Sequence, residues 1–273
     1  MSIQSYIRRY DKKTGVGTDF TGVFTMNESP IYFISDAHLG AEDYVSEKPR
    51  RHHFLNFLRS LRGKTNQLYI VGDLFDFWLD YQSVIPRQHY TVLYELNVLV
   101  ENGTQITYIS GNHDFSLGTF LDQQVGLKTS HGPLTVNHQD RRIFLAHGHG
   151  LGPGDLSYKI LSKILYNRFF INSFRIIHPD LGFILGRLFS RLSRTHTKPT
   201  TIDPNENHRE LVFSLFNEGY DIVVLGHSHS PALWDKDGKV YINLGDWLRH
   251  YTYGVLRNGR MTLEKYENDT TVP

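Results

Sequence analysis

This 273-residue chain has five short clusters that combine histidine, aspartate, asparagine and glycine, with six histidines in four of them, and side chains of these types bind metal ions. The chain has no cysteine, so imidazole, carboxylate and amide groups are the available ligands, and this donor set favours Mn²⁺, Fe²⁺ or Zn²⁺ at a hydrolytic centre. More than four candidate ligands indicate two ions, which need a shared carboxylate, and Asp73 is the natural bridge. The clusters read DAH (36–38), GDLFD (72–76), GNHD (111–114), HGH (147–149) and GHSH (226–229).

Each cluster follows an apolar run that predicts a buried β-strand, and helical patterns separate several of these runs. A strand–helix–strand order implies a largely parallel sheet, in which the carboxyl ends of the strands share an edge. We therefore expect the clusters to converge on one rim. The predicted strands are 31–35, 67–72, 105–111, 142–146 and 221–226, with a further strand, 240–245, that runs into Asp246. The predicted helices are 51–63, 87–103 and 207–219, each of which stops at a glycine.

The last part of the chain has a different pattern. Residues 234–243 and 253–266 place Asp-Gly and Asn-Gly between extended runs, which is the strongest short signal for a β-hairpin. These hairpins are expected to extend a mixed sheet or to pack as a second one.

Composition sets the broad class of the protein. The 29 Lys and Arg against 28 Asp and Glu leave a formal charge of +1, so nothing global points to nucleic acid or to an acidic partner. No run approaches the roughly 18 apolar residues that a membrane-spanning helix needs, and the lack of cysteine suits a reducing cytosolic compartment. Residues 1–25 are interpreted as an extension, a tag or an upstream start, and 26–273 as a single domain.

The five clusters, in this order, resemble the calcineurin-like metallophosphoesterases. The resemblance spans residues 36 to 229 and implies an α/β fold of two mixed β-sheets flanked by helices, a four-layer α/β/β/α sandwich. It also implies two metal sites. Asp36, His38 and His229 would bind one ion, Asn112, His147 and His227 the other, and Asp73 both.

Two such ions lower the pKa of a bound water and neutralise phosphoryl oxygens, so hydrolysis of a phosphoester or phosphoanhydride is the expected reaction. His113 and Asp114 are the predicted catalytic residues: His113, expected to be held by its neighbour Asp114, is the candidate that donates a proton or a charged hydrogen bond to the leaving oxygen. Neither His149 nor Asp76 is interpreted as a ligand: His149 is expected to support a ligand or to face the substrate, and Asp76 to support a ligand or to have a structural role.

A long insertion at 156–198 separates two predicted strands. It carries eight lysines and arginines against one acid, Asp180, and its Leu, Ile and Phe recur every three or four residues. This pattern predicts two or three amphipathic helices, broken near HPDLG (178–182), with an apolar inner face and basic rims. Such helices either cap the sheet or act as a lid that holds acyl chains and meets an anionic membrane surface.

Within the family, the chain is similar to the UDP-2,3-diacylglucosamine diphosphatases of lipid A synthesis, through FISDAHLG (33–40), GDLFDFW (72–78), GNHDF (111–115), the run from His147 to Asp155, and the lid. That branch implies Mn²⁺ as the metal, release of UMP and 2,3-diacylglucosamine 1-phosphate, and a cytoplasmic enzyme peripherally associated with the inner membrane. Two positions depart from it: GNHDF replaces the usual GNRDF, and HGH replaces HGD. Substrate contacts are carried over to Asn112, His113, Asp155, Ser193, Thr197 and Lys198.

Other functions remain compatible with the sequence. One is a phosphatase or phosphodiesterase acting on another phosphoester, such as a nucleotide or phosphoprotein. Another is a non-catalytic scaffold that binds a partner, although scaffolds of this kind usually lose metal ligands and none is missing here. A nucleic-acid groove is not expected, because Leu and Ile outnumber stacking residues in the lid.

Overall fold

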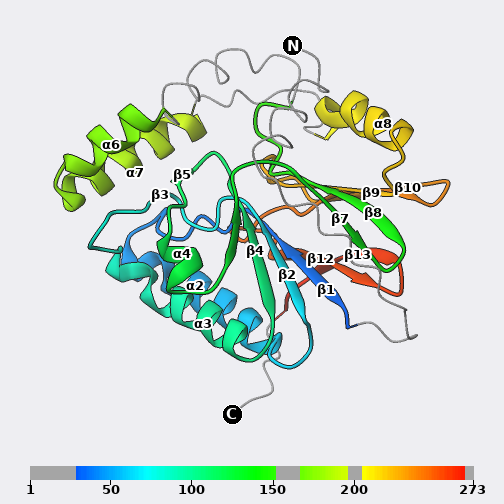
Figure 1. The fold of residues 1–273 in the computed structure, drawn as a ribbon, viewed down its shortest axis with the longest axis horizontal. Helices are drawn as coiled ribbons and strands as arrows, with labels where there is room; N and C mark the ends of the chain where they lie inside the picture. The colour runs from blue at the N-terminus through cyan, green and yellow to red at the C-terminus, as the bar shows by residue number, and fades with distance from the viewer. Residues whose placement is uncertain (1–28, 152–166, 196–204, 268–273) are drawn as a thin grey trace.

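The protein forms two β-sheets that pack face to face with helices on both outer sides, in a computed structural model that describes residues 29–151, 167–195 and 205–267 (Figure 1). The α/β/β/α sandwich expected from the sequence is therefore confirmed. The division into an extension at 1–25 and one domain from 26 stays a prediction, since residues 1–25 lie outside the described part.

The first sheet has six strands in the order β13-β12-β1-β2-β4-β6. Its centre is parallel, because β1 pairs with β2, β2 with β4 and β4 with β6 in the same direction, whereas β12 joins β1 antiparallel. These strands are β1 (Ile31–Ile34), β2 (Gln67–Val71), β4 (Gln105–Ile109), β6 (Lys128–Ser130), β12 (Thr252–Arg257) and β13 (Arg260–Lys265).

The second sheet has five strands in the order β10-β11-β9-β8-β7. Its three central strands, β8, β9 and β11, are parallel, and both edge strands are antiparallel to their neighbours. The bounds are β7 (Leu134–His138), β8 (Arg141–Leu145), β9 (Ile222–Leu225), β10 (Ala232–Lys236) and β11 (Lys239–Asn243). A short pair, β3 (Trp78–Leu79) with β5 (Asp114–Ser116), lies beyond the first sheet.

The central strands are apolar throughout because both of their faces are buried. In β1, Phe33 faces the core between the two sheets and Ile34 faces the helices. In β9, Val224 faces the core between the sheets, and Val223 faces α8. Alternate residues of one strand thus serve two cores, which fixes the register, since a slip by one residue would exchange the two faces.

Helices α2 and α3 cover the outer face of the first sheet, and α8 covers the second (Figure 1). Each of the three predicted helices was confirmed, and the glycine after each, Gly63, Gly103 and Gly219, has a left-handed φ of 68° to 90°. The first helix begins earlier than predicted, because Asp43 caps it by accepting from the N–H groups of Val45 and Ser46. The helix bounds are α2 (Tyr44–Ser60), α3 (Tyr90–Glu101), α4 (Phe120–Gln123) and α8 (Arg209–Asn217), with 3-10 turns at Arg87–His89 and Glu206–His208.

Both predicted hairpins form. Asp237-Gly238 joins β10 to β11 and Asn258-Gly259 joins β12 to β13, and all four turn residues have positive φ, as a two-residue turn of this kind requires. The first hairpin belongs to the second sheet and the second to the first sheet. One hairpin thus extends the first, mixed sheet and the other is part of the second sheet, so both arrangements expected from the sequence occur.

The described part of the insertion consists of two helices, α6 (Arg168–Ile176) and α7 (Pro179–Thr195), which lie next to β3 and β5 (Figure 1). The break falls at Ile177 and His178, as expected from the sequence. Their inner side packs Ile171, Phe174 and Phe183 against an apolar cluster at the β3 segment, formed by Phe77, Leu79 and Tyr81.

The expected polarity of the insertion is wrong in part. Arg175 donates to the backbone oxygen of Asp80, and Arg187 donates to the side chain of Gln88, so these two basic residues hold the insertion to the domain. The inner side of α7 packs closely, since a Cβ at Gly186 would come within 2.5 Å of the Phe77 ring. The outer side of α7 is not purely basic, because three large apolar residues face outward: Leu181, Ile184 and Leu188, which are 51%, 57% and 50% exposed.

Candidate metal centre

The five histidine and aspartate clusters meet between the two sheets. Three of them follow β1, β2 and β4 of the first sheet, and two follow β8 and β9 of the second. The sequence predicted convergence on one rim. The structure corrects this to two adjoining rims, because the strands that carry His147 and His229 belong to the other layer of the sandwich.

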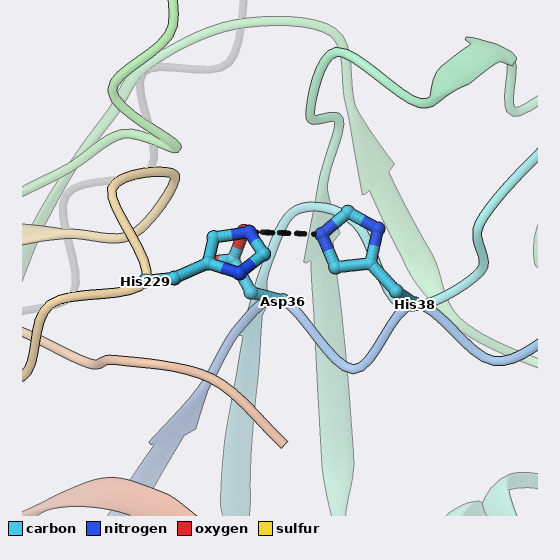
Figure 2. A group of neighbouring side chains, drawn as sticks. All are labelled: Asp36, His38 and His229. Carbon is cyan, nitrogen blue, oxygen red and sulfur yellow. Dashed lines mark hydrogen bonds and ion pairs between the residues drawn. The ribbon is translucent and has the colours of Figure 1, made fainter. Parts of the chain in front are cut away.

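Asp36, His38 and His229 form the first group (Figure 2). The two imidazole rings approach each other from different layers, with 3.1 Å between their Nε2 atoms. Asp36 Oδ1 lies 3.2 Å from His229 Nε2 and 3.6 Å from His38 Nε2. Three potential ligand atoms thus point at one small volume.

Asp73, His147 and Asp36 form the second group. His147 Nε2 lies 3.2 Å from Asp73 Oδ2 and 3.0 Å from Asn112 Oδ1. The ring of His227 stands against His147, with 5.2 Å between the ring centroids. Asp73 Oδ2 is also 3.7 Å from His38 Nε2, so this carboxylate lies between the two groups, where a bridging ligand is required.

Five of the seven predicted ligands have a left-handed backbone. The φ values of Asp36, His38, Asp73, His227 and His229 are 52°, 42°, 52°, 69° and 54°. This conformation costs a non-glycine residue about 1–2 kcal/mol. Such strain clusters at functional sites, and here it turns side chains of successive loops toward a common point.

The donor set fits a divalent metal site. Nitrogen and oxygen donors converge, no sulfur is present, and two imidazole nitrogens face each other at hydrogen-bond distance in a buried site. Asp36 and Asp73 are almost completely buried, and burial by itself would raise their pKa values, but the neighbouring histidines lower both pKa values below the ordinary range. The two carboxylates are therefore anionic and suited to a cation.

Metal binding is expected to release protons. Burial alone would lower the pKa of His38, but Asp36 and Asp76 outweigh it and raise that pKa to about 10; Asp73 and Asp36 likewise raise the pKa of His147 to about 9 despite burial. Both rings are protonated at pH 7 and must be neutral to bind a metal, so affinity should rise with pH up to that range. Calorimetric titration with Mn²⁺ at pH 7, in buffers of different ionisation enthalpy, measures the release. Heats independent of the buffer would contradict this expectation.

His113 is held by a residue other than the one expected. Its Nδ1 lies 2.7 Å from the backbone oxygen of Asp76, which can only accept, so Nδ1 carries a proton and Nε2 faces Asp73 at 3.9 Å. Asp114 instead accepts from the N–H groups of Asp73 and Gly111 and from the hydroxyl of Tyr108. The predicted pairing of His113 with Asp114 is thus wrong, because both carboxylate oxygens of Asp114 bind other donors.

Asp76 and His149 lie next to the predicted ligands. Asp76 Oδ1 is 3.6 Å from His38 Nδ1, the ring nitrogen opposite the metal-facing one, which is the usual place for a carboxylate that orients a ligand. The ring of His149 is 5.3 Å from that of His147, and burial together with the charge of His147 lowers its pKa to about 3. His149 is therefore neutral at physiological pH.

Asp246 is a site residue whose role the sequence did not reveal. Its Oδ2 lies 3.8 Å from His229 Nδ1 and 2.9 Å from His250 Nδ1, and its Oδ1 accepts from the N–H groups of residues 248, 249 and 250. The only available signal was its position after a strand, shared with the metal ligands.

The proposed substrate contacts of the insertion are not described by the structure. Asp155, Thr197 and Lys198 lie outside the described residues, and Ser193 is placed only as a backbone position in α7. These four assignments stay predictions.

Residues 29–231 match the family model described as calcineurin-like phosphoesterase, and the chain belongs to this family. A Stutzerimonas stutzeri protein named UDP-2,3-diacylglucosamine hydrolase is 31% identical over 225 residues, which cover 80% of this chain and 91% of that protein. Proteins of the same name from Porphyromonas gingivalis and Neisseria meningitidis serogroup B are each 28% identical, over 88% and 87% of this chain and 98% and 99% of theirs.

The chain is a metal-dependent phosphoester hydrolase. Among the residues that the structure describes, no helix is long and apolar enough to cross a membrane.

Proposed function

We propose that this protein hydrolyses the diphosphate of UDP-2,3-diacylglucosamine to UMP and 2,3-diacylglucosamine 1-phosphate in lipid A synthesis, as a cytoplasmic enzyme at the surface of the inner membrane. The observation that carries the proposal is an exposed apolar stripe on the helical insertion of a phosphoester hydrolase. The names of the relatives support the same substrate.

Two divalent ions, proposed to be Mn²⁺, would be held by the two groups of ligands. Asp36, His38 and His229 would bind one ion, and Asp73 would be shared by both. The second ion would be bound by Asp73 together with Asn112, His147 and His227. The ions supply Lewis acidity toward phosphoryl oxygens and a nucleophile at neutral pH when they are bound.

The chain itself supplies orientation and a proton. His113 donates Nδ1–H to the Asp76 backbone oxygen, so the proton given to the leaving oxygen must be a second one, on Nε2 of the doubly protonated ring; burial lowers the pKa of His113, which makes that imidazolium a stronger acid. Asp114 acts through the backbone: its bonds to the N–H groups of Asp73 and Gly111 hold the loops that carry Asp73 and Asn112. Asp114 is therefore assigned a positioning role in place of the catalytic one first expected.

The insertion would meet the lipid part of the substrate. Leu181, Ile184 and Leu188 follow at three-and-four spacing on α7, and Phe169 and Ile176 of α6 are 82% and 86% exposed. An exposed apolar surface of this kind commonly marks a lipid or partner site. The net positive charge of the insertion favours an anionic membrane surface.

The test is to incubate the protein with Mn²⁺ and UDP-2,3-diacylglucosamine in micelles and to measure UMP. The triple variant Leu181→Ser, Ile184→Ser, Leu188→Ser is expected to lose at least about tenfold in UMP formation, since each buried apolar side chain contributes about 1.5–3 kcal/mol. Its hydrolysis of bis-p-nitrophenyl phosphate, which has no acyl chain, should stay unchanged. The matched control, Tyr90→Ser with Tyr94→Ser, alters two exposed aromatics of α3 and should affect neither reaction.

The outcomes separate the alternatives. Cleavage of bis-p-nitrophenyl phosphate without formation of UMP would refute the lipid substrate and leave a phosphodiesterase of other specificity. If the wild-type protein binds Mn²⁺ but catalyses neither reaction, the result would favour a non-catalytic scaffold. Binding to anionic vesicles that persists after deletion of residues 160–195 would count against the insertion as the membrane-facing element.

A further inference from the structure

The loop after β1 carries two metal ligands and has an unusual backbone. Asp36, His38 and Gly40 all have positive φ, at 52°, 42° and 95°. The N–H groups on one side of this loop donate to the loop after β2, with Asp36 N bonded to Gly72 O at 3.1 Å and His38 N to Asp73 O at 2.9 Å. Within the loop, the carbonyl group of His38 accepts from the N–H of Ala41 at 3.1 Å.

A buried arginine of α2 binds the carbonyl group of Ala37 and adds a second hydrogen bond to that of His38. Arg50, 8% exposed, donates through Nη1 to the backbone oxygen of Ala37 and through Nη2 to that of His38, the latter at 3.3 Å. The two peptide groups that flank the Cα of His38 thus bind the same guanidinium. In extended backbone successive carbonyl groups point to opposite sides, so one guanidinium reaches both only when His38 is helical or left-handed.

Glu47 fixes Arg50 in turn. Its carboxylate is fully buried, lies 3.0 Å from Arg50 Nη2, and also accepts from the backbone N–H of Gly40 and from Arg51. The first two turns of α2 are therefore tied to both ends of the segment 37–40. Arg51 is a useful comparison because it binds the same carboxylate and is equally buried, but its guanidinium lies over the ring of Tyr44.

We propose that Arg50 is a positioning residue for the metal centre: its guanidinium holds the left-handed backbone of His38 and so directs that imidazole at the metal. The inference rests on the metal site and not on the identity of the substrate. Lysine at this position has one ammonium group in place of the planar fork and cannot bridge the two carbonyl groups in the same way. Removal of residues that orient a metal ligand typically lowers metal affinity about 10–100-fold.

The experiment compares Arg50→Lys with Arg51→Lys in the full chain. Mn²⁺ is titrated into metal-free protein, and the free ion is measured by electron paramagnetic resonance. The Kd should rise at least about tenfold for Arg50→Lys and less than about twofold for Arg51→Lys. With bis-p-nitrophenyl phosphate as substrate, the Mn²⁺ concentration for half-maximal rate should rise in parallel for Arg50→Lys, while the rate at saturating Mn²⁺ recovers most of the wild-type value.

Thermal unfolding of the metal-free variants separates positioning from general stability. Equal weakening of Mn²⁺ binding by both substitutions, or none by Arg50→Lys, overturns the proposal. If Arg50→Lys lacks a cooperative unfolding transition, the titration is done on Glu47→Gln, which is nearly isosteric and loosens the guanidinium; unchanged Mn²⁺ affinity in that variant also overturns it. Failure of the lipid substrate would leave every one of these measurements interpretable, since none uses that substrate.

Discussion

Asp73→Asn is expected to lower kcat/KM for bis-p-nitrophenyl phosphate by at least about 10³-fold. The carboxylate of Asp73 lies between the two ligand groups, 3.2 Å from His147 and 3.7 Å from His38. A bound metal ion contributes several kcal/mol of transition-state stabilisation, and each 1.36 kcal/mol corresponds to about tenfold in rate. Steady-state kinetics at saturating Mn²⁺ and metal analysis of the purified variant measure the effect, and the metal content should fall below that of the wild type.

The Asp73→Asn substitution removes the negative charge of the side chain and keeps its shape. Asparagine tolerates the left-handed φ of 52° at this position, and its amide oxygen can still accept the N–H of His113, which now bonds Asp73 Oδ1 at 2.9 Å. The control is Asp122→Asn, the same chemical change at an exposed residue of α4, which should leave both rate and metal content unchanged. A fully active Asp73→Asn protein with a normal metal content would exclude Asp73 as the shared ligand.

His113→Ala is expected to lower kcat about 10²–10⁴-fold for a substrate with a poor leaving group, and much less for bis-p-nitrophenyl phosphate. The reason is that proton donation matters most where the departing oxygen is basic. The ring is fixed through Nδ1 by the Asp76 backbone oxygen, and its Nε2 faces the site. Phosphoester substrates of graded leaving-group basicity, compared at saturating Mn²⁺, give the measurement.

The control for His113 is His52→Ala on the exposed side of α2, which should leave all rates unchanged. Metal content must be normal in His113→Ala for the rates to report on proton transfer. Equal losses for good and poor leaving groups would indicate that His113 orients the site and does not donate to the leaving oxygen.

The elements that the sequence predicted well depend on local signals. The helices that stop at Gly63, Gly103 and Gly219 and the hairpins at Asp237-Gly238 and Asn258-Gly259 are specified by residues within a few positions of one another. Their turns need positive φ, which glycine and asparagine supply at little steric cost. The five clusters are likewise local, because each consists of the few residues directly after the end of a strand.

The parts that the sequence predicted poorly depend on contacts between distant segments. No residue pattern near β8 or β9 indicates that these strands form a second sheet. The sequence therefore predicts one rim of ligands, whereas the structure has two. The predicted pairing of His113 with Asp114 is wrong because neighbours in sequence need not contact each other, and the observed partner is the backbone oxygen of Asp76. The face of α7 that packs on the domain is set by the close approach of Gly186 to Phe77, a contact with a distant segment that periodicity within one helix does not reveal.

The residues that support the metal ligands were hidden for the same reason. Arg50 belongs to an amphipathic helix and Asp246 to the end of a strand, and each becomes informative only through the loop that it contacts. The ligands themselves were accessible because their residue types are unusual for strand ends. The supporting residues, by contrast, are of common types at common positions, such as an arginine on an amphipathic helix.

The two-layer origin of the ligands has a consequence for folding. His38 and His229 are 191 positions apart in the chain and belong to different sheets, so an ion bound by both acts as a removable cross-link between the layers. Whatever binds the native state and not the unfolded chain adds stability by mass action, about 2.7 kcal/mol at a free concentration 100 times the Kd. The concentration of free metal therefore affects two properties of the enzyme: its activity, and the free energy of unfolding of the two-sheet sandwich.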